Sequence, residues 1–246
     1  MKVVYHEDYN QVYASDPASA PGRIRAIEAA LEGKVSFITP RAAAREDILR
    51  AHTPEHVRNV EREGVYNSAA LAAGGAILAA QTALVEPCFA VIRPPGHHAS
   101  ASSAWGFCYF NNMAVALEKL KSEGKIREVF ILDFDLHYGD GNVNILGGRG
   151  YATILNPDSE NRQDYLKAVE TALARTGADM IAVSAGFDNH ENDWGGLMKT
   201  EDYTFMGRLV RETARRNQGG CFGILEGGYN HRVLGQNVLA FIQGLE

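Results

Sequence analysis

Asp135 and His137 stand two positions apart, directly after a short apolar run of the chain. Side chains two positions apart on an extended strand end point to the same side, so this carboxylate and this imidazole can share one cation. A third carboxylate would complete a three-ligand site with an open position, which is typical of catalytic zinc. Asp188 and Asp193 both compete for that third place. The pair alone is a weak signal, because helix caps use the same residue types.

Two adjacent histidines, His97 and His98, follow a Pro-Pro-Gly turn whose backbone is constrained. One interpretation is a surface loop with incidental histidines. The other is a general base and its electrostatic partner beside a metal site. Asp133 and Asp140 flank the metal motif, and each can accept a hydrogen bond from one imidazole, which would fix its tautomer.

Two aromatic segments complete the candidate site. Tyr229 follows two glycines, so its hydroxyl can be directed into a site as an oxyanion donor, although the same segment is compatible with an ordinary turn. The tripeptide Trp105–Phe107 follows the double histidine. It is suited to lining an apolar channel, and a core position for Trp105 is an equal alternative.

The elements that must position these residues are predicted from apolar runs. Seven short runs are continuous rather than alternating, which is typical of strands buried on both faces. These predicted strands are Val3–His6, Val35–Ile38, Phe89–Ile92, Val129–Leu132, Ala152–Leu155, Met180–Ser184 and Phe222–Leu225. Helical patterns cover Arg23–Leu31, Pro54–Glu63, Ser68–Val85, Met113–Ser122, Tyr165–Thr176, Asp202–Asn217 and Val233–Leu245, with Pro54 and Ser68 as helix-start residues. The alternation predicts an α/β protein with an open, mainly parallel sheet between two helix layers.

Four of the predicted strands are followed by residues that can do chemistry. These segments are Arg93–His98, Asp133–Asp140, Ala185–Asp193 and Glu226–Tyr229. Because ligands of such sheets bind at the carboxyl ends of the strands, we expect the four segments to form one site. The order of the strands in the sheet cannot be read from the sequence.

The composition excludes several classes of protein. The 246 residues are 46% hydrophobic and 22% charged with a net charge of −6, so neither disorder nor a basic surface for nucleic acid is expected. The three cysteines are far apart, which argues against a disulfide framework or a cysteine zinc site. The apolar run Ala69–Val85 is interrupted by glycines and polar residues, so we expect a core helix and no membrane partner. Since no apolar signal segment begins the chain and no linker divides it, we expect a single cytoplasmic domain over residues 1–246.

Five ordered motifs resemble the zinc-dependent deacetylase superfamily, which includes histone deacetylases, acetylpolyamine amidohydrolases and acetoin-utilisation proteins. The motifs are R-P-P-G-H-H-A (Arg93–Ala99), G-F-C-Y-F-N (Gly106–Asn111), D-F-D-L-H-Y-G-D-G (Asp133–Gly141), S-A-G-F-D (Ser184–Asp188) and L-E-G-G-Y (Leu225–Tyr229). Two earlier segments, Pro21–Ile24 and Ala51–Val57, are similar as well. The resemblance extends from about Tyr5 to the C-terminus and implies the three-layer arginase-like α/β fold.

The resemblance also implies roles for single residues. Asp135, His137 and Asp193 would bind zinc, with ferrous iron as the other candidate metal, and Asp188 would be structural. Asp193 is chosen because the third ligand of the family lies a few residues beyond S-A-G-F-D.

The other implied roles concern catalysis and substrate binding. His98 would be the general base and later the acid, with His97 as its electrostatic partner. Tyr229 would polarise the amide carbonyl, while Gly106 and Phe107 would line an acyl-lysine channel. The substrate would be acetyl-lysine in a peptide, an acetylpolyamine or another small acylated amine.

Several positions depart from the family pattern. Tyr138 replaces a second histidine, Trp194 follows Asp193 in place of proline, and a serine that helps to bind potassium is missing, so potassium binding stays open. The segment Asn156–Gln163 is short and lacks the second channel aromatic. We therefore expect an open groove for bulky acyl groups, a homodimer that closes it, or a new wall built by a residue of that segment.

The sequence therefore predicts a metal-dependent amide hydrolase that removes an acyl group from an amine. One alternative is a catalytically silent protein that binds acylated ligands. Another is a ureohydrolase of the same fold, which would need a two-metal site and typically an aspartate where Gly139 stands.

Overall fold

The centre of the protein is one sheet of seven parallel strands. The computed structural model describes residues 1–246. The strands are β1 (Lys2–Val4), β2 (Ser36–Ile38), β3 (Cys88–Ala90), β4 (Val129–Asp133), β5 (Ala152–Leu155), β6 (Met180–Ala185) and β7 (Gly220–Leu225), and they lie in the order β2-β1-β3-β7-β6-β4-β5. Every neighbouring pair is parallel. The predicted parallel α/β architecture is confirmed, and the sheet is wholly rather than mainly parallel.

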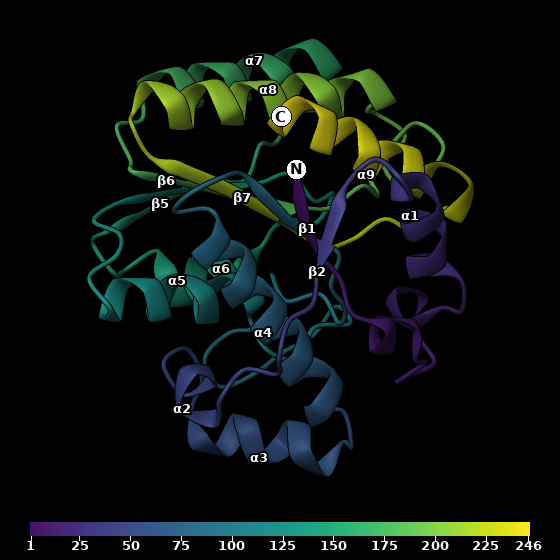
Figure 1. Cartoon of the computed structure of the whole chain (residues 1–246), viewed down its shortest axis with the longest axis vertical. Coiled ribbons are helices and arrows are strands. Elements are labelled where there is room, and N and C mark those ends of the chain that lie inside the picture. The colour runs from purple at the N-terminus through teal and green to yellow at the C-terminus, as the bar shows by residue number, and fades with distance from the viewer.

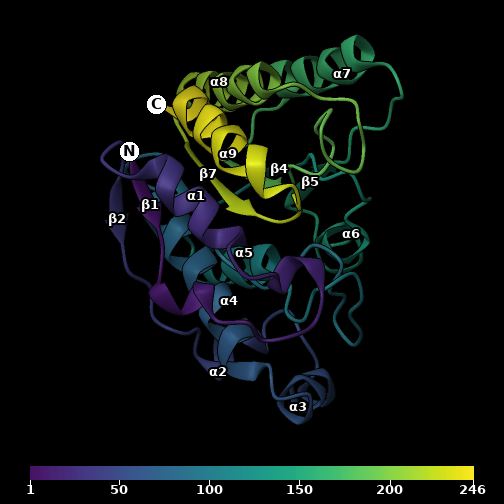
Figure 2. The same ribbon diagram turned by 90° about the vertical axis from the view of Figure 1, so that its right-hand side faces the viewer.

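Helices cover both faces of this sheet. They are α1 (Arg23–Leu31), α2 (Arg45–Ile48), α3 (Pro54–Arg62), α4 (Tyr66–Thr82), α5 (Asn112–Ser122), α6 (Asp140–Leu146), α7 (Arg162–Arg175), α8 (Thr200–Arg216) and α9 (His231–Leu245), with single 3₁₀ turns at Glu7–Asn10 and Pro17–Ser19. Helices α7, α8 and α9 lie on one side of the sheet and α4 and α5 on the other (Figures 1 and 2). None of the helices combines the length and the apolar character needed to cross a membrane.

All fourteen predicted strands and helices are present, with ends that differ by a few residues. Pro54 opens α3 behind Thr53, whose side chain accepts a hydrogen bond from the N–H of His56. The prediction of Ser68 as a helix start is wrong, because α4 begins two residues earlier, at Tyr66. The short helices α2 and α6 were not predicted, since four or seven residues give too few turns for an apolar period. The edge strands β2 and β5 are partly exposed, so burial on both faces holds only for inner strands.

The strand order explains why the chemical segments meet. The four predicted chemical segments follow β3, β7, β6 and β4, and these strands are successive neighbours in the sheet. Because the strands are parallel, their carboxyl ends lie along one edge. The sheet therefore brings the four segments together, as expected from the sequence.

Helix α6 packs closely against the double-histidine turn. A Cβ atom at Gly141 would lie 2.5 Å from Ala99 O and 2.6 Å from His97 O. The N–H of Asn142 donates to His97 O at 3.1 Å. The start of α6 thus fixes the backbone of the histidine turn from one side, and only a glycine leaves the space for it.

The Gly141→Ala variant should therefore be less stable, by about 1–3 kcal/mol, because the added methyl group meets backbone atoms that cannot rotate away. Urea unfolding followed by circular dichroism measures the difference. Gly148→Ala is the matched control, since a Cβ atom at that position would have no neighbour within 4 Å. Equal urea midpoints for the two variants would contradict the close packing.

Candidate active site

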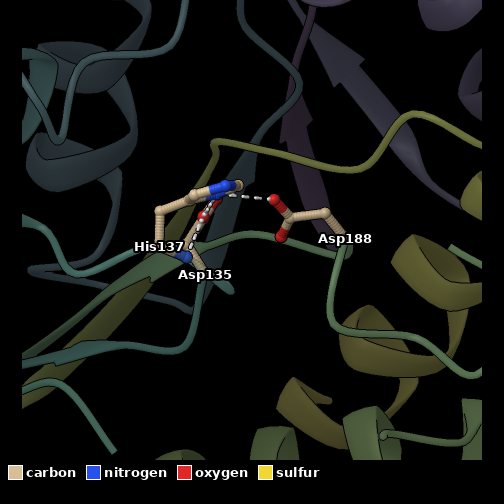
Figure 3. A group of neighbouring side chains, drawn as sticks. All are labelled: Asp135, His137 and Asp188. Atoms are coloured by element: carbon tan, nitrogen blue, oxygen red, sulfur yellow. Dashed lines mark hydrogen bonds and ion pairs between the residues drawn. The ribbon is translucent and has the colours of Figure 1, made fainter. Parts of the chain in front are cut away.

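Asp135, His137 and Asp188 form a compact cluster at the ends of β4 and β6 (Figure 3). The Nδ1 atom of His137 lies 3.2 Å from Asp135 Oδ1 and 3.1 Å from Asp188 Oδ2. One ligand atom from each residue lies within 4.8 Å of the other two. Two carboxylate oxygens and one imidazole nitrogen are a ligand set that suits zinc and leaves a fourth position open.

The two buried carboxylates of this cluster favour the binding of a cation. Both carboxylates are buried, and burial together with the neighbouring Asp135 raises the pKa of Asp188 to about 6. Hydrogen bonds from His137 to Asp135 and Asp188 raise the pKa of the imidazole to about 10. Apart from the contact with His137 Nδ1 at 3.1 Å, Asp188 Oδ2 has no polar partner. A divalent cation would replace the imidazole proton and satisfy this oxygen, so the residues fit a metal ion.

Backbone N–H groups hold the carboxylate oxygens of Asp135 and Asp188 that do not contact His137 Nδ1. Asp135 Oδ2 accepts from the N–H of Gly227 at 2.8 Å, and Asp188 Oδ1 accepts from the N–H of Leu136 at 3.1 Å. Such contacts fix the orientation of ligand side chains before a metal binds.

Asp193, the third ligand that the resemblance implies, is absent from this cluster, and Asp188 stands in its place. The Oδ2 atom of Asp193 accepts hydrogen bonds from the N–H groups of Tyr229 and Asn230, each at 2.8 Å, and its Oδ1 accepts from the N–H of Trp194 at 2.9 Å. Asp193 thus ties its own loop to the turn that carries Tyr229. The contact with His137 favours Asp188 as the third ligand, whereas the resemblance favours Asp193.

The two histidines make the hydrogen bonds predicted for them. His97 Nδ1 lies 3.2 Å from Asp133 Oδ2, and His98 Nδ1 lies 2.7 Å from Asp140 Oδ1. In both rings Nδ1 is engaged with a carboxylate. For His98 this leaves Nε2 as the ring nitrogen that can meet a substrate.

The environments of the two imidazoles differ in charge. Burial opposes protonation of His97, yet the carboxylates of Asp135 and Asp133 raise its pKa well above the usual range. Burial and the nearby charge of His97 lower the pKa of His98 to about 4. At neutral pH the protein without metal therefore holds a charged His97 beside a neutral His98. A neutral imidazole can accept a proton, which is the property that a general base needs.

A pocket of about 130 Å³ lies beside the cluster. Its walls contain all the predicted pocket residues and both tryptophans, and its ten lining residues are Pro95, His97, His98, Trp105, Gly106, Phe107, His137, Trp194, Gly227 and Tyr229. Burial raises the pKa of Tyr229 above its usual range, so its hydroxyl stays protonated and can donate. Gly106 has φ +59°, and a Cβ there would lie 2.4 Å from His98 Cδ2, so this glycine allows the close approach of His98.

Rings surround the pocket as a nearly continuous belt. Trp105 stacks on His98 with 3.9 Å between ring centroids, and Trp194 stacks on Tyr229 at 4.0 Å. Distances of 6.0 Å join His98 to His137, His137 to Trp194, and Tyr229 to Phe107. No residue of Asn156–Gln163 lines this pocket, so that segment does not rebuild the missing wall. Trp194 supplies an aromatic wall instead.

The sequence reasoning missed two residues of this site. The sequence motifs mark Trp194 only as a replacement for proline, and they do not single out Asn142. Asn142 Nδ2 donates to Asp133 Oδ2 at 3.0 Å. A tryptophan beside a strand-end motif was the available signal for the first, whereas nothing in the sequence singles out the second.

Comparisons with known proteins agree with this fold. A family model described as "Histone deacetylase domain" matches residues 18–150 and 147–245. A probable deacetylase of Methanothermobacter thermautotrophicus is 30% identical over 304 aligned positions, which cover 100% of this chain and 91% of that protein. A probable deacetylase of Archaeoglobus fulgidus is 31% identical over 93% of this chain and 81% of its own length. The crystal structure titled "HDA15 HD domain" superimposes with a TM-score of 0.85 at 26% identity, covering 99% of this chain and 88% of that one.

The chain belongs to the histone deacetylase family. A histone deacetylase-like amidohydrolase of Pseudomonas aeruginosa is 27% identical over 94% of this chain and 77% of that protein. Family membership and this similarity support a deacetylase or amidohydrolase function. The alignment of 304 positions with the first relative exceeds the 246 residues of this chain. The relative therefore carries insertions with respect to this chain.

The geometry of the cluster predicts that Asp188→Ala loses bound metal, while Asp193→Ala keeps it. Removal of Asp188 leaves only two ligands, whereas removal of Asp193 frees backbone N–H groups outside the cluster. Elemental analysis of the purified variants after loading with zinc makes the comparison. Full metal content in Asp188→Ala together with its loss in Asp193→Ala would assign the third position to Asp193, as the resemblance implies.

Proposed function

We propose that the protein is a metal-dependent amide hydrolase that removes an acetyl or larger acyl group from a lysine- or polyamine-like amine. The observation that carries the proposal is the joining of three kinds of group in one pocket. These are a three-ligand cluster, a pair of histidines each held by an aspartate, and a tyrosine. Amide hydrolysis requires a Lewis acid, a base that moves a proton and a donor to the carbonyl oxygen, and the three groups can supply these in turn. Family membership makes this reaction class the first candidate.

The pocket favours a slender substrate. Its volume of about 130 Å³ is enough for one acyl group and part of an alkyl stem. The faces of Phe107, Trp105 and Trp194 offer apolar surface for that stem. The scissile carbonyl would then lie between the metal ligands and Tyr229.

Asp135 and His137, with Asp188 or Asp193 as the third ligand, would hold the metal, zinc or ferrous iron, which supplies Lewis-acid chemistry to the carbonyl and to water. His98 accepts a proton from the attacking water at Nε2, and Asp140 stabilises the imidazolium that forms. Tyr229 donates its hydroxyl hydrogen to the carbonyl oxygen as negative charge develops there. His98 then returns the proton to the leaving amine, while His97 stays hydrogen-bonded to Asp133 beside it.

A ureohydrolase is disfavoured by the space around Gly139. A Cβ at this position would lie 1.9 Å from Asp133 Oδ2. An aspartate for a second metal would therefore collide with the carboxylate that orients His97. The geometry of the site does not argue against a catalytically silent binding protein. Only an activity measurement separates this alternative from the enzyme.

Potassium binding and the homodimer stay predictions. The homodimer was expected because one wall of the pocket was missing. Trp194 now lines that pocket, which removes this reason for a second protomer.

The proposed function predicts that the metal-loaded protein releases acetate from an acetyl-lysine peptide or from N-acetylputrescine. Treatment with a chelator should abolish this release, and added zinc should restore it. Acetate is measured enzymatically over a panel that also contains butyryl-lysine and agmatine. Binding without release would favour the silent protein, and urea from agmatine would favour the ureohydrolase.

The role of Tyr229 predicts that Tyr229→Phe lowers kcat by about 10²–10³-fold, because one oxyanion donor is lost while the ring remains. Metal content should be unchanged, since Tyr229 is outside the ligand cluster. Tyr138→Phe is the control, because Tyr138 is 60% exposed and does not line the pocket. Near-normal turnover by Tyr229→Phe would contradict the assignment.

A further inference from the structure

Trp105 contacts both His98 and Asp140, which we call the outer pair because Asp140 is partly exposed; the buried His97 and Asp133 are the inner pair. Its ring stacks on His98 with 3.9 Å between centroids and 31° between planes. Its Nε1–H donates to Asp140 Oδ2 at 2.9 Å. Since Asp140 Oδ1 meets His98 Nδ1 at 2.7 Å, the three side chains form a closed triangle of two hydrogen bonds and one stacking contact.

The inner pair is built on the same plan with a different third member. Asp133 receives a hydrogen bond from Asn142 Nδ2 at 3.0 Å, in addition to its contact with His97. This inner group is fully buried, so water cannot compete for the carboxylate. In both pairs a second side-chain N–H donor holds the aspartate. In the inner pair it shares Oδ2 with His97, whereas in the outer pair it binds the oxygen that His98 leaves free.

The outer pair needs such a donor more than the inner one. The side chain of Asp140 is 33% exposed, so water can reach its carboxylate and loosen its grip on His98. Burial raises the pKa of Asp140, but the hydrogen bonds from Trp105 and His98 more than offset this and keep it below its usual range. An ionised, fixed carboxylate holds His98 with its proton on Nδ1.

We propose that Trp105 is a positioning residue for the catalytic base, holding Asp140 through its indole N–H and His98 through its ring, so that Nε2 of His98 faces the substrate. The inference rests on the proposed function, because it assigns Trp105 a part in the same reaction. It differs from a role in lining the pocket, which would affect substrate binding rather than the proton transfer. Gly106, directly beside it in the chain, allows this approach to His98.

The test is a comparison of Trp105→Phe with Trp194→Phe on an acetyl-lysine peptide. Trp105→Phe keeps an aromatic ring but loses the N–H donor, so kcat should fall about 10- to 100-fold at a KM within about twofold of the wild type. Trp194 lines the same pocket but stacks on Tyr229, so Trp194→Phe should change KM rather than kcat. Zinc content and melting temperature should be unchanged in both variants. Trp105→Leu, which loses the ring as well, should lose more kcat than Trp105→Phe.

A spectroscopic measurement reports the contact without turnover. The chain has two tryptophans, so Trp194→Phe leaves one indole N–H signal, that of Trp105. This signal should be protected from hydrogen exchange, and Asp140→Asn should shift it and speed its exchange. An unprotected indole N–H, or a Trp105→Phe variant with normal kcat or with only KM changed, would overturn the inference while the wild type stays active. A wild type that hydrolyses nothing in the panel would instead overturn the proposed function, and this inference with it.

Discussion

Four buried carboxylates lie close together at the ends of the central strands, and the site depends on the groups that offset their negative charge. Asp133, Asp135, Asp188 and Glu226 are each at most 6% exposed. Buried carboxylates so close together repel one another and lack the solvation of water. Positive charge on His97 and His137, together with backbone N–H groups, offsets this repulsion, and a divalent cation would complete the balance. The conformation of the strand-end segments therefore serves to place these positive charges and N–H donors against the carboxylates.

Backbone donors come from the same strand ends that carry the acids. Glu226 Oε2 accepts from the N–H groups of Gly96 and His97, so β7 holds the histidine turn after β3. Asp135, after β4, accepts from Gly227 after β7. Both acidic residues thus fix the backbone of a neighbouring segment through one oxygen. Fold and site are therefore stabilised by the same contacts, and a change in one segment is expected to move the others.

A gradient of exposure separates the parts of the site. The inner pair of His97 and Asp133 is sealed from solvent. The outer pair of His98 and Asp140 borders the pocket, where protons must be exchanged with substrate. The aromatic belt surrounds this outer pair and reduces access of water. Trp105 and Trp194 belong to that belt although more than half of each side chain is exposed, so they are accessible both to a substrate and to mutation.

The sequence by itself determined the strands, the long helices and the four segments in which the chemistry lies. This was possible because apolar runs and the glycines that follow them are local signals. It also indicated that Asp133 and Asp140 each accept from one of the two histidines, since both acids flank the metal motif. Which acid meets which histidine was left to the structure.

Only the tertiary structure decided that β3, β7, β6 and β4 are neighbours, because strand order depends on how helices pack between them. It also separated Asp188 from Asp193. These carboxylates are five residues apart in the sequence, and the path of the loop directs one to His137 and the other to the backbone of Tyr229. The positions of Trp105 and Trp194 around the pocket follow from the same loop paths, which hydrogen bonds between distant segments determine and which no local pattern encodes.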